Sequence, residues 1–454
     1  MVFFGNLNKL KWPKRSMYQN QRIAVPFALV CMSLKTCTGD VSPCACESIP
    51  IMQHSFDASS LSFPEVPPNL KLQQCIVITR HGDRVPISRS LGKSLPECTK
   101  RERSWKALLP KNQDLHPRNV VNPVYKQSCG SFEPRDHGQE PYAQLTIRGM
   151  KQHESLGEYL RKHFLKNGLL SHNLNPEEIY ARSTNLQRTI QSAQSLLYGL
   201  YPPSSRAPGK AGIVQLNVWP IAEEILIPNA NRKCQRQYEI IKELQRAGDI
   251  PEDLQASGFE EECKSVLGLD DNLNWAQVLE VLLCHEIHGI PQPKGVTPTF
   301  LEKTYRASIG RWTKWFQHPE FNRLAIGPFL NEICAKMKEA VSGDSSYPRF
   351  VLFSAHDNTL VPVLCALGCF DGQLPPYASV LCFEVAQNIL DGKHLVRITY
   401  NNKEMNAYQK SEKWLPFKEF AENLMRSVPA NYKDECSITA SKKNLDCVES
   451  TKQR

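Results

Sequence analysis

The chain has 454 residues, of which 41% are hydrophobic and 22% are charged, and this is the composition of an ordinary globular protein. The length suffices for one large domain, or for a core that carries a sizeable insertion. The net charge of +9 includes six Lys and Arg residues that precede the first acidic residue, Asp40, so the rest of the chain is nearly balanced. We therefore expect no nucleic-acid partner, whereas an anionic small-molecule substrate remains compatible with the charge.

Residues 1–40 are basic and, before Asp40, free of acidic side chains, and they contain an apolar run from Ile23 to Leu34. The run is short for a membrane span, so we interpret the segment as a secretory signal or a mitochondrial presequence. Either interpretation predicts the secretory pathway or the mitochondrion rather than the cytosol, and it leaves membrane association through this segment open. Residues 41–71 are rich in Ser and Pro and are predicted to be a linker, and residues 437–454 a polar tail.

The first predicted strand of the core ends in a cluster of polar residues. Ile76, Val77 and Ile78 form the β-branched run of a buried strand, and Arg-His-Gly-Asp-Arg follows at 80–84. Ligands of open α/β sheets bind at the carboxyl ends of strands, where these side chains would lie. Two guanidinium groups beside one imidazole suit a phosphoryl group, because arginines bind its oxygens while the histidine acts as a nucleophile. The alternative is a solvated basic turn without a function.

Two further strand-to-helix junctions carry side chains of the same kind. The strand at 179–181 leads into Arg182, and Arg188 follows about one turn into the next helix, whose N-terminus favours anions. The strand at 350–354 is followed by His356 and Asp357 and then by another helix. Taken singly, each junction is explained equally well by polar residues at a helix start. Together with the first motif, they predict one shared phosphate site.

The alternation of strands and helices predicts an α/β fold with a mainly parallel sheet. We assign residues 72–203 and 347–436 to the α/β core. Residues 204–346 are predicted to form a mainly helical cap, inserted into the core and opened by a strand-like stretch at 213–219. The excursion at 87–141 has little periodicity, and we expect substrate selection there, since long loops in compact domains are usually functional or mobile.

The pattern Arg-His-Gly-x-Arg-x-Pro at 80–86 has a chance occurrence on the order of 10⁻⁴ in a chain of this length. It resembles the signature of the histidine acid phosphatases, branch 2 of the histidine phosphatase superfamily. The similarity runs from about residue 72 to residue 436, and it is strongest at 156–161, 180–201 and 353–379. The resemblance implies a phosphoglycerate-mutase-like, three-layer core with an inserted helical cap.

The chemistry that these residues suggest is hydrolysis of a phosphomonoester through a phosphohistidine intermediate. Neutral His81 would attack phosphorus, and Asp357 would donate a proton to the leaving alcohol and then serve as the base for water. The phosphoryl oxygens would be bound by Arg80, Arg84, Arg188 and His356, with Arg182 as an additional candidate. The resemblance implies the same roles for these positions, Arg182 excepted. A carboxyl group beside several cations should have a depressed pKa, so we expect an acidic working pH.

Sixteen cysteines is a high count for this length, and it favours an oxidising compartment. The resemblance implies a disulfide between Cys234 and Cys436. It also matches Cys284 to a half-cystine whose partner position is occupied by Val380, which leaves Cys382 as a substitute partner.

Two short cysteine motifs resemble parts of metal sites. Cys-Ala-Cys at 44–46 and Cys-His-x-x-His at 284–288 each lack a matching second half at zinc spacing. We therefore predict no metal site. The proposed chemistry needs no other cofactor, because the guanidinium groups supply the positive charge.

The favoured function is a metal-independent acid phosphatase that acts on lysophosphatidic acid or a related lipid phosphate. One alternative is a phosphatase of sugar or inositol phosphates, and a second is an inactive protein that retains the phosphate pocket. An inositol polyphosphate site would need several further Lys or Arg residues in the 87–141 excursion and in the cap. The sequence does not indicate an oligomeric state.

Overall fold

The computed structural model describes residues 63–94, 99–115, 121–126, 141–207, 212–229, 233–248, 250–269, 273–343 and 346–437. Within these residues one sheet has the strand order β2-β4-β3-β5-β1-β6-β7-β8, and β9 pairs with β7. The parallel part consists of β2 (Val121–Tyr125), β4 (Val214–Val218), β3 (Ile179–Ser183), β5 (Phe350–Ala355) and β1 (Leu70–Arg80). The antiparallel part adds β6 (Val380–Asn388), β7 (His394–Tyr400), β8 (Lys403–Glu404) and β9 (Trp414–Pro416). The predicted α/β class is confirmed.

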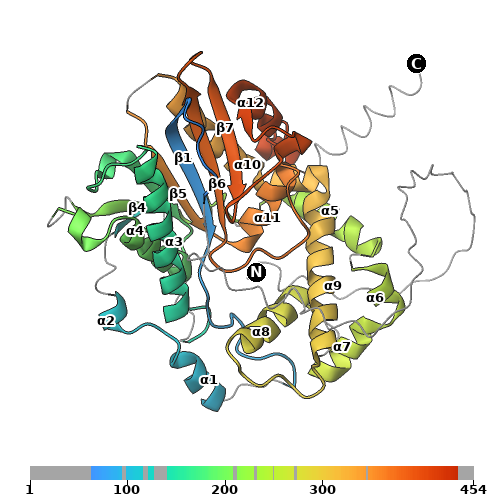
Figure 1. Ribbon diagram of the computed structural model, residues 1–454. Helices are drawn as coiled ribbons and strands as arrows, with labels where there is room; N and C mark the ends of the chain where they lie inside the picture. Colours follow the sequence, from blue (N-terminus) through green and yellow to red (C-terminus); the bar gives the residue numbers. More distant parts are fainter. Residues whose placement is uncertain are drawn as a thin grey trace, which may run out of the picture.

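The strand β1 lies in the middle of the sheet (Figure 1) and is flanked by β5 and β6. Its residues from Cys75 to Ile78 are completely buried, which is what a β-branched run between two layers of helices requires. In the parallel register Arg80 lies opposite Ala355 of β5, and Ser183 of β3 lies opposite Ser354. The carboxyl ends of these strands are therefore level, and the segments that follow them leave the sheet at the same edge.

Helices cover both faces of the sheet (Figure 1). On one face α3 (Ile147–Lys166) and α4 (Gln187–Leu200) pack together, and their leucines share an apolar cluster with Val77 of β1. On the other face lie α10 (Pro319–Val341), α11 (Asp357–Ala366) and α12 (Phe417–Met425), packed against Ile76 and Ile78. Residues of alternating direction along β1 therefore contribute to two separate cores, as the pleat of a strand dictates.

Five further helices build a third apolar cluster beside the sheet: α5 (Gln235–Arg246), α6 (Glu252–Ala256), α7 (Phe259–Leu267), α8 (Trp275–Ile287) and α9 (Pro298–Gln317). Two parts of the 204–346 range nevertheless belong to the core, because β4 lies inside the sheet and α10 packs on its face. The predicted core boundary at residue 203 therefore comes before β4, which is one of the parallel strands of the core sheet. Among the described residues, no helix is long and apolar enough to cross a membrane.

The remaining elements are short. The 87–141 excursion contains α1 (Thr99–Lys106), α2 (Asn112–Leu115) and the edge strand β2, which the weak periodicity did not reveal. The helix α13 (Tyr432–Glu435) ends the described chain, and 3₁₀ turns occupy Pro176–Glu178, Pro203–Ser205 and Ala407–Gln409. The predicted targeting segment 1–40, most of the linker and residues 438–454 lie outside the described residues.

The structure contains a disulfide between Cys234 and Cys436, which joins the start of α5 to the end of α13. Cys284 and Cys382 are both free thiols, so the expected substitution of Cys382 as the partner of Cys284 is wrong. The sulfur of Cys284 lies 3.8 Å from the Tyr377 hydroxyl, whereas Cys382 packs beside Cys75 in the sheet. The two cysteines belong to different apolar clusters.

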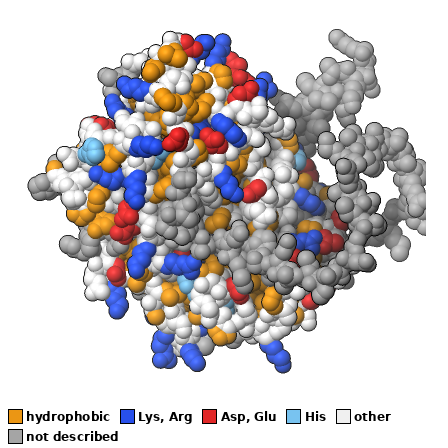
Figure 2. Space-filling view, viewed as in Figure 1, with side chains coloured by type: hydrophobic (Ala, Val, Ile, Leu, Met, Phe, Trp, Pro, Cys, Tyr) orange, Lys and Arg blue, Asp and Glu red, His pale blue; other side chains and the backbone are white. Residues whose placement is uncertain are grey.

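The two histidines of the Cys-His-x-x-His motif at 284–288 contact different parts of the protein and do not converge on one point. Nδ1 of His285 donates to the carbonyl of Pro291 at 2.9 Å, and Nε2 of His288 lies 3.2 Å from the Asp83 carboxylate. Among the described residues there is no group of three metal-ligating side chains, and the motif at 44–46 lies outside them. On the face shown in Figure 2, Lys and Arg side chains are scattered among acidic and apolar ones rather than gathered in one patch.

Candidate active site

The six side chains singled out in the sequence lie at one edge of the sheet. Arg80 ends β1, the loop after it carries His81 and Arg84, Arg188 lies in the first turn of α4, and His356 and Asp357 begin α11. None of the six is more than 5% exposed. The ring centroids of His81 and His356 are 5.5 Å apart, and Nη2 of Arg80 lies 2.9 Å from Oδ2 of Asp357. Three segments distant in the sequence thus form one buried, mostly cationic cluster.

The imidazole of His81 has a defined tautomer. Its Nδ1 lies 2.9 Å from the carbonyl oxygen of Gly82, and a carbonyl only accepts, so Nδ1 carries the hydrogen. Nε2 therefore keeps its lone pair. Burial, followed by the charges of Arg188, Arg84 and Arg80, holds the pKa of His81 well below its ordinary value. The ring is consequently neutral and nucleophilic even in mildly acidic solution.

Gly82 is required because two backbones approach each other closely. A Cβ atom at this position would lie 2.4 Å from the carbonyl oxygen of Gly149 in α3, while the φ angle of Gly82 is not in the left-handed region. The amide of Gly82 donates to the Ser192 hydroxyl at 3.0 Å, and the amide of His81 donates to the carbonyl of Ala355 at 2.9 Å. The loop is thereby held between α3, α4 and β5.

Asp357 is the first residue of α11 and lies against the arginines. The amide of Asn358 donates to its Oδ1 at 2.8 Å, and Arg80 binds Oδ2. Burial alone would raise the pKa of Asp357, but Arg80 and Arg84 outweigh it and hold the pKa below its ordinary value. The carboxyl group is therefore ionised until the solution is strongly acidic or a phosphate takes its place beside Arg80.

Sequence reasoning missed two residues of the cluster. Glu280 of α8 lies 2.6 Å from Nη1 of Arg84 and also accepts the amide of Ile87 at 2.5 Å. The ring of Tyr377 lies beneath Arg80, whose guanidinium carbon is 4.3 Å from the ring centroid. No local signal marks Glu280, because its partner Arg84 lies 196 residues away in the sequence, and nothing beyond its place in the 353–379 similarity singled out Tyr377.

A pocket lined by described residues reaches this cluster. Arg80, Arg84 and Asp357 lie at its polar end, and its remaining lining is Leu279, Glu280, Leu283, Ile287, Leu374 and Tyr377. Three of the apolar residues, Leu279, Leu283 and Ile287, come from one face of α8, because residues four apart lie on the same side of a helix. The described residues that the cap contributes to this wall are thus apolar apart from Glu280, and none of them is Lys or Arg.

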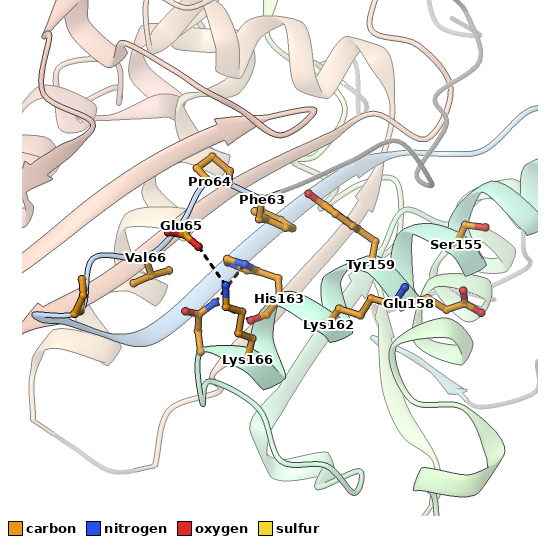
Figure 3. A pocket seen from close by; sticks show the side chains of 12 residues that line it. Phe63, Pro64, Glu65, Val66, Ser155, Glu158, Tyr159, Lys162, His163 and Lys166 are labelled. Atoms are coloured by element: carbon orange, nitrogen blue, oxygen red, sulfur yellow. Dashed lines mark hydrogen bonds and ion pairs between the residues drawn. The ribbon is translucent and has the colours of Figure 1, made fainter.

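A larger pocket of about 640 Å³ lies elsewhere, between the C-terminal half of α3 and residues 63–68 (Figure 3). There Phe63 stacks on Tyr159 and on His163, with ring centroids 4.8 and 3.9 Å apart respectively. This pocket adjoins the start of β1, whereas the cationic cluster follows its end. The pocket that contains the proposed catalytic and phosphate-binding side chains is therefore the smaller of the two.

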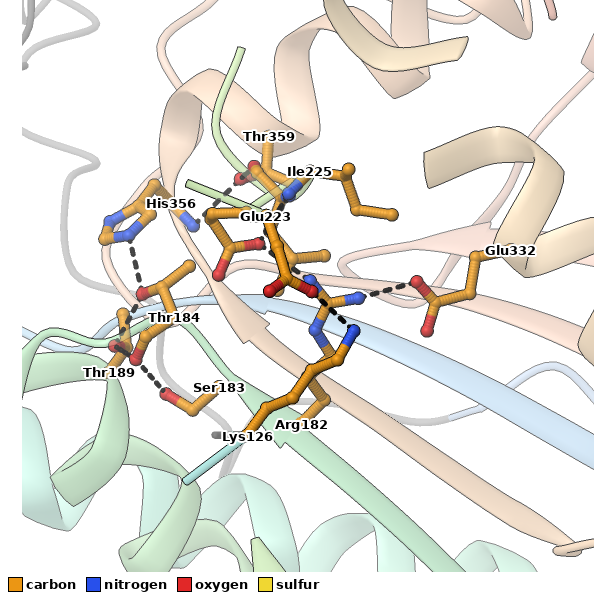
Figure 4. Close-up of polar contacts among 12 residues, drawn as sticks. Lys126, Arg182, Ser183, Thr184, Thr189, Glu223, Ile225, Glu332, His356 and Thr359 are labelled. Carbon is orange, nitrogen blue, oxygen red and sulfur yellow. Dashed lines mark hydrogen bonds and ion pairs between the residues drawn. The ribbon is translucent and has the colours of Figure 1, made fainter. Parts of the chain in front are cut away.

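Arg182 does not join the cationic cluster, contrary to the suggestion from the sequence. It is completely buried, and it forms ion pairs with Glu224 at 2.9 Å and with Glu332 at 2.6 Å (Figure 4). Its guanidinium group also stacks on the ring of Trp219. Successive residues of a strand point to opposite faces, and Arg182 points to the face covered by α10.

Comparisons with known proteins identify the family of this chain. Residues 71–401 match the family model of the histidine phosphatase superfamily (branch 2). Human testicular acid phosphatase is 31% identical over 72% of this chain and 70% of its own, and mouse lysophosphatidic acid phosphatase type 6 is 27% identical over 82% and 89%. The apo form of Hafnia alvei phytase shares the fold, with a TM-score of 0.55 at 14% identity over 82% of this chain and 100% of the phytase. The chain belongs to branch 2 of the histidine phosphatase superfamily.

Proposed function

We propose that the protein is an acid phosphatase that hydrolyses phosphomonoesters through a phosphohistidine on His81. The observation that carries the proposal is the free Nε2 lone pair of a neutral imidazole, placed within one buried cluster of three arginines, a second imidazole and a carboxyl group. Arg80, Arg84 and Arg188 neutralise the phosphoryl oxygens together with His356, as a metal ion does in other phosphatases.

The reaction takes two displacement steps. Nε2 of His81 forms a bond to phosphorus while the bond from phosphorus to the ester oxygen breaks, and a proton from Asp357 leaves with the alcohol. A water molecule then gives a proton to Asp357 and attacks phosphorus, the bond to Nε2 breaks, and inorganic phosphate leaves. The proton on Asp357 leaves with inorganic phosphate, so the free enzyme is regenerated and no further reactant is needed.

The proton on Asp357 can be delivered by the substrate. The depressed pKa of this carboxyl group keeps it ionised in the free enzyme. A phosphate ester below its second pKa of about 6 binds as the monoanion, which brings one proton into the cluster. When the ester displaces Asp357 from Arg80, this proton can reside on the carboxyl group. Activity then requires the monoanion and declines above about pH 6, which is the property of an acid phosphatase.

For the substrate we propose a phosphomonoester with an apolar group, of which a lipid phosphate such as lysophosphatidic acid is the leading case. The support is the pocket wall of Leu279, Leu283 and Ile287 next to the arginines, together with the similarity to lysophosphatidic acid phosphatase type 6. An inositol polyphosphate would place further phosphates against this wall and against Glu280, where it would meet no compensating charge in the described lining. The phytase-like fold supports only the architecture.

The experiment compares hydrolysis of p-nitrophenyl phosphate by the wild-type protein and by His81→Ala. We expect the substitution to abolish turnover while the protein stays folded, and activity that survived it would overturn the phosphohistidine mechanism. A panel of lysophosphatidic acid, phytate and phosphotyrosine then tests the substrate class, with lysophosphatidic acid expected to have the highest kcat/KM. Preference for phytate would instead establish the sugar- and inositol-phosphate alternative.

We also propose a compartment outside the cytosol, in the secretory pathway or the mitochondrion. The support is the basic, acid-poor segment 1–40 and the Cys234–Cys436 disulfide, which persists in oxidising surroundings. Expression with a C-terminal fluorescent tag, followed by N-terminal sequencing of the purified protein, separates the two addresses. A cytosolic signal with an intact N-terminus would contradict both.

A further inference from the structure

Arg182 is a buried cation that the proposed mechanism does not use. Its side chain is fully buried and its charge is shared between Glu224, in the turn after β4, and Glu332 of α10. Burying such charges is costly, and the cost is recovered only with excellent geometry and additional hydrogen bonds. Figure 4 shows that the contacts around Arg182 continue toward His356, one of the residues of the cationic cluster.

The first step of this connection is Glu224. Its Oε1, which binds Arg182, also accepts the amide of Ile225 at 2.9 Å and the amide of Leu226 at 2.7 Å. One carboxylate oxygen therefore fixes the backbone direction of two successive residues. Without the charge of Arg182 this carboxylate would be buried unpaired, so the arginine and the turn depend on each other.

The second step leads from the turn to the start of α11. The hydroxyl of Thr359 donates to the carbonyl of Leu226 at 2.5 Å, and the amide of His356 donates to the same hydroxyl at 3.3 Å. Thr359 thus holds the residue that precedes α11 to the turn that Glu224 organises. From the other side, Nε2 of His356 lies 3.0 Å from the hydroxyl of Thr184, two residues after Arg182. The backbone of His356 is therefore held through the turn that contains Glu224, the partner of Arg182, and the ring of His356 is held by the segment that contains Arg182 itself.

We infer that Arg182 and Glu224 are positioning residues for the phosphate site: through Leu226 and Thr359 they hold His356 where it can bind a phosphoryl oxygen. This inference rests on the proposed function of His356. Because Glu332 belongs to α10, the same ion pairs also tie the helix that covers the sheet to the edge where phosphate binds. The neighbouring Glu223 is not part of this connection, since it pairs with the exposed Lys126 at 2.6 Å.

The test uses Glu224→Gln and Thr359→Val, with Glu223→Gln and Thr359→Ser as matched controls. Glu223→Gln removes a charge from the same turn without touching the connection, and Thr359→Ser keeps the hydroxyl. We measure kcat/KM for p-nitrophenyl phosphate and the Kd of inorganic phosphate by calorimetry. Glu224→Gln and Thr359→Val should each lose about tenfold in both quantities, because small displacements of a binding group are costly. Both controls should stay within about twofold of the wild type.

A merely structural effect is separated by repeating both variants in a His356→Ala background. If they act through His356, the loss of phosphate affinity should shrink to less than about twofold there. An equal loss in both backgrounds, or wild-type values for both variants, would overturn the inference. If Glu224→Gln does not fold, the Thr359→Val and Thr359→Ser pair decides alone. Because phosphate affinity is measured without turnover, the result stands even if His81→Ala shows that the phosphohistidine mechanism is wrong.

Discussion

Substitution of Glu280 tests quantitatively how the net charge of the cationic cluster affects stability and phosphate binding. Arg80 pairs with Asp357, Arg84 pairs with Glu280, and Arg188 acts on His81, so these five charged groups have a net charge of +1 when both carboxyl groups are ionised. Glu280→Gln raises this net charge to +2 and leaves an amide oxygen that can still accept from Arg84 and from the amide of Ile87. The substitution therefore changes charge with little change in shape.

The change should have opposite effects on stability and on phosphate binding. Removing one partner of a buried ion pair costs about 3–5 kcal/mol, and since the amide keeps hydrogen bonds we expect about 2–3 kcal/mol of lost unfolding free energy. At an effective dielectric constant of about 20, a unit charge about 6 Å from phosphate contributes about 3 kcal/mol. Even a third of this value would tighten the binding of inorganic phosphate by more than about fivefold.

Urea unfolding with and without phosphate, together with calorimetric titration of phosphate, measures both effects. We expect Glu280→Gln to be less stable than the wild type without ligand, and to gain more stability from phosphate. Glu286→Gln, an exposed position on the same helix, is the control and should change neither quantity. Weaker phosphate binding by Glu280→Gln in a folded protein would refute the electrostatic reasoning.

Three further predictions follow from the described contacts. The value of kcat/KM should rise as pH falls toward about 6, because the substrate becomes the monoanion, and should then stay level on further mild acidification, because the pKa of His81 is held well below its ordinary value. A fall in kcat/KM on acidification below 6.5 would show that His81 titrates normally. The pKa of buried His356 is likewise lowered, so below pH 6.5 the unfolded chain binds a proton that the native state does not bind. The free energy of unfolding therefore decreases on acidification by up to about 1.4 kcal/mol per pH unit. In urea unfolding between pH 7.5 and 5, His356→Asn should reduce this slope, and an unchanged slope would count against a neutral His356. Replacing Cys234 and Cys436 by Ala removes a covalent link between residues 202 positions apart. The substitution should lower the free energy of unfolding by about 3–5 kcal/mol and leave the KM for p-nitrophenyl phosphate unchanged. A change in KM without a loss of stability would show instead that the disulfide acts on the active site.

The core of the fold and the cationic cluster could be predicted because each rests on a local pattern. The run from Ile76 to Ile78 predicts a buried strand, and the pattern of polar residues at its end favours a phosphate ligand over a solvated basic turn. Parallel register then brings Arg80 and His356 to the same edge, since β1 and β5 pair directly. The helices on both faces follow from the same reasoning, because a parallel sheet must be covered on both sides.

Arg182, Glu280 and β2 could not be predicted, and each failure has a physical reason. The direction of Arg182 depends on which face of β3 it occupies, and a short strand of five residues gives too little alternation to decide this. Glu280 acquires its role from Arg84, 196 residues away in the sequence, so no local signal exists. The strand β2 contains Pro123 and has little burial, and it is held in the sheet by pairing with β4 rather than by its own pattern.

The most direct test of the phosphohistidine mechanism is a rapid acid-free quench of the enzyme during turnover, followed by peptide mapping of the phosphorylated residue. Phosphate should be found on His81, and its yield should rise in Asp357→Asn with a substrate whose leaving group needs no proton, because the second step then lacks its base. Phosphate on another residue, or turnover by His81→Ala without any phosphorylated intermediate, would contradict the mechanism.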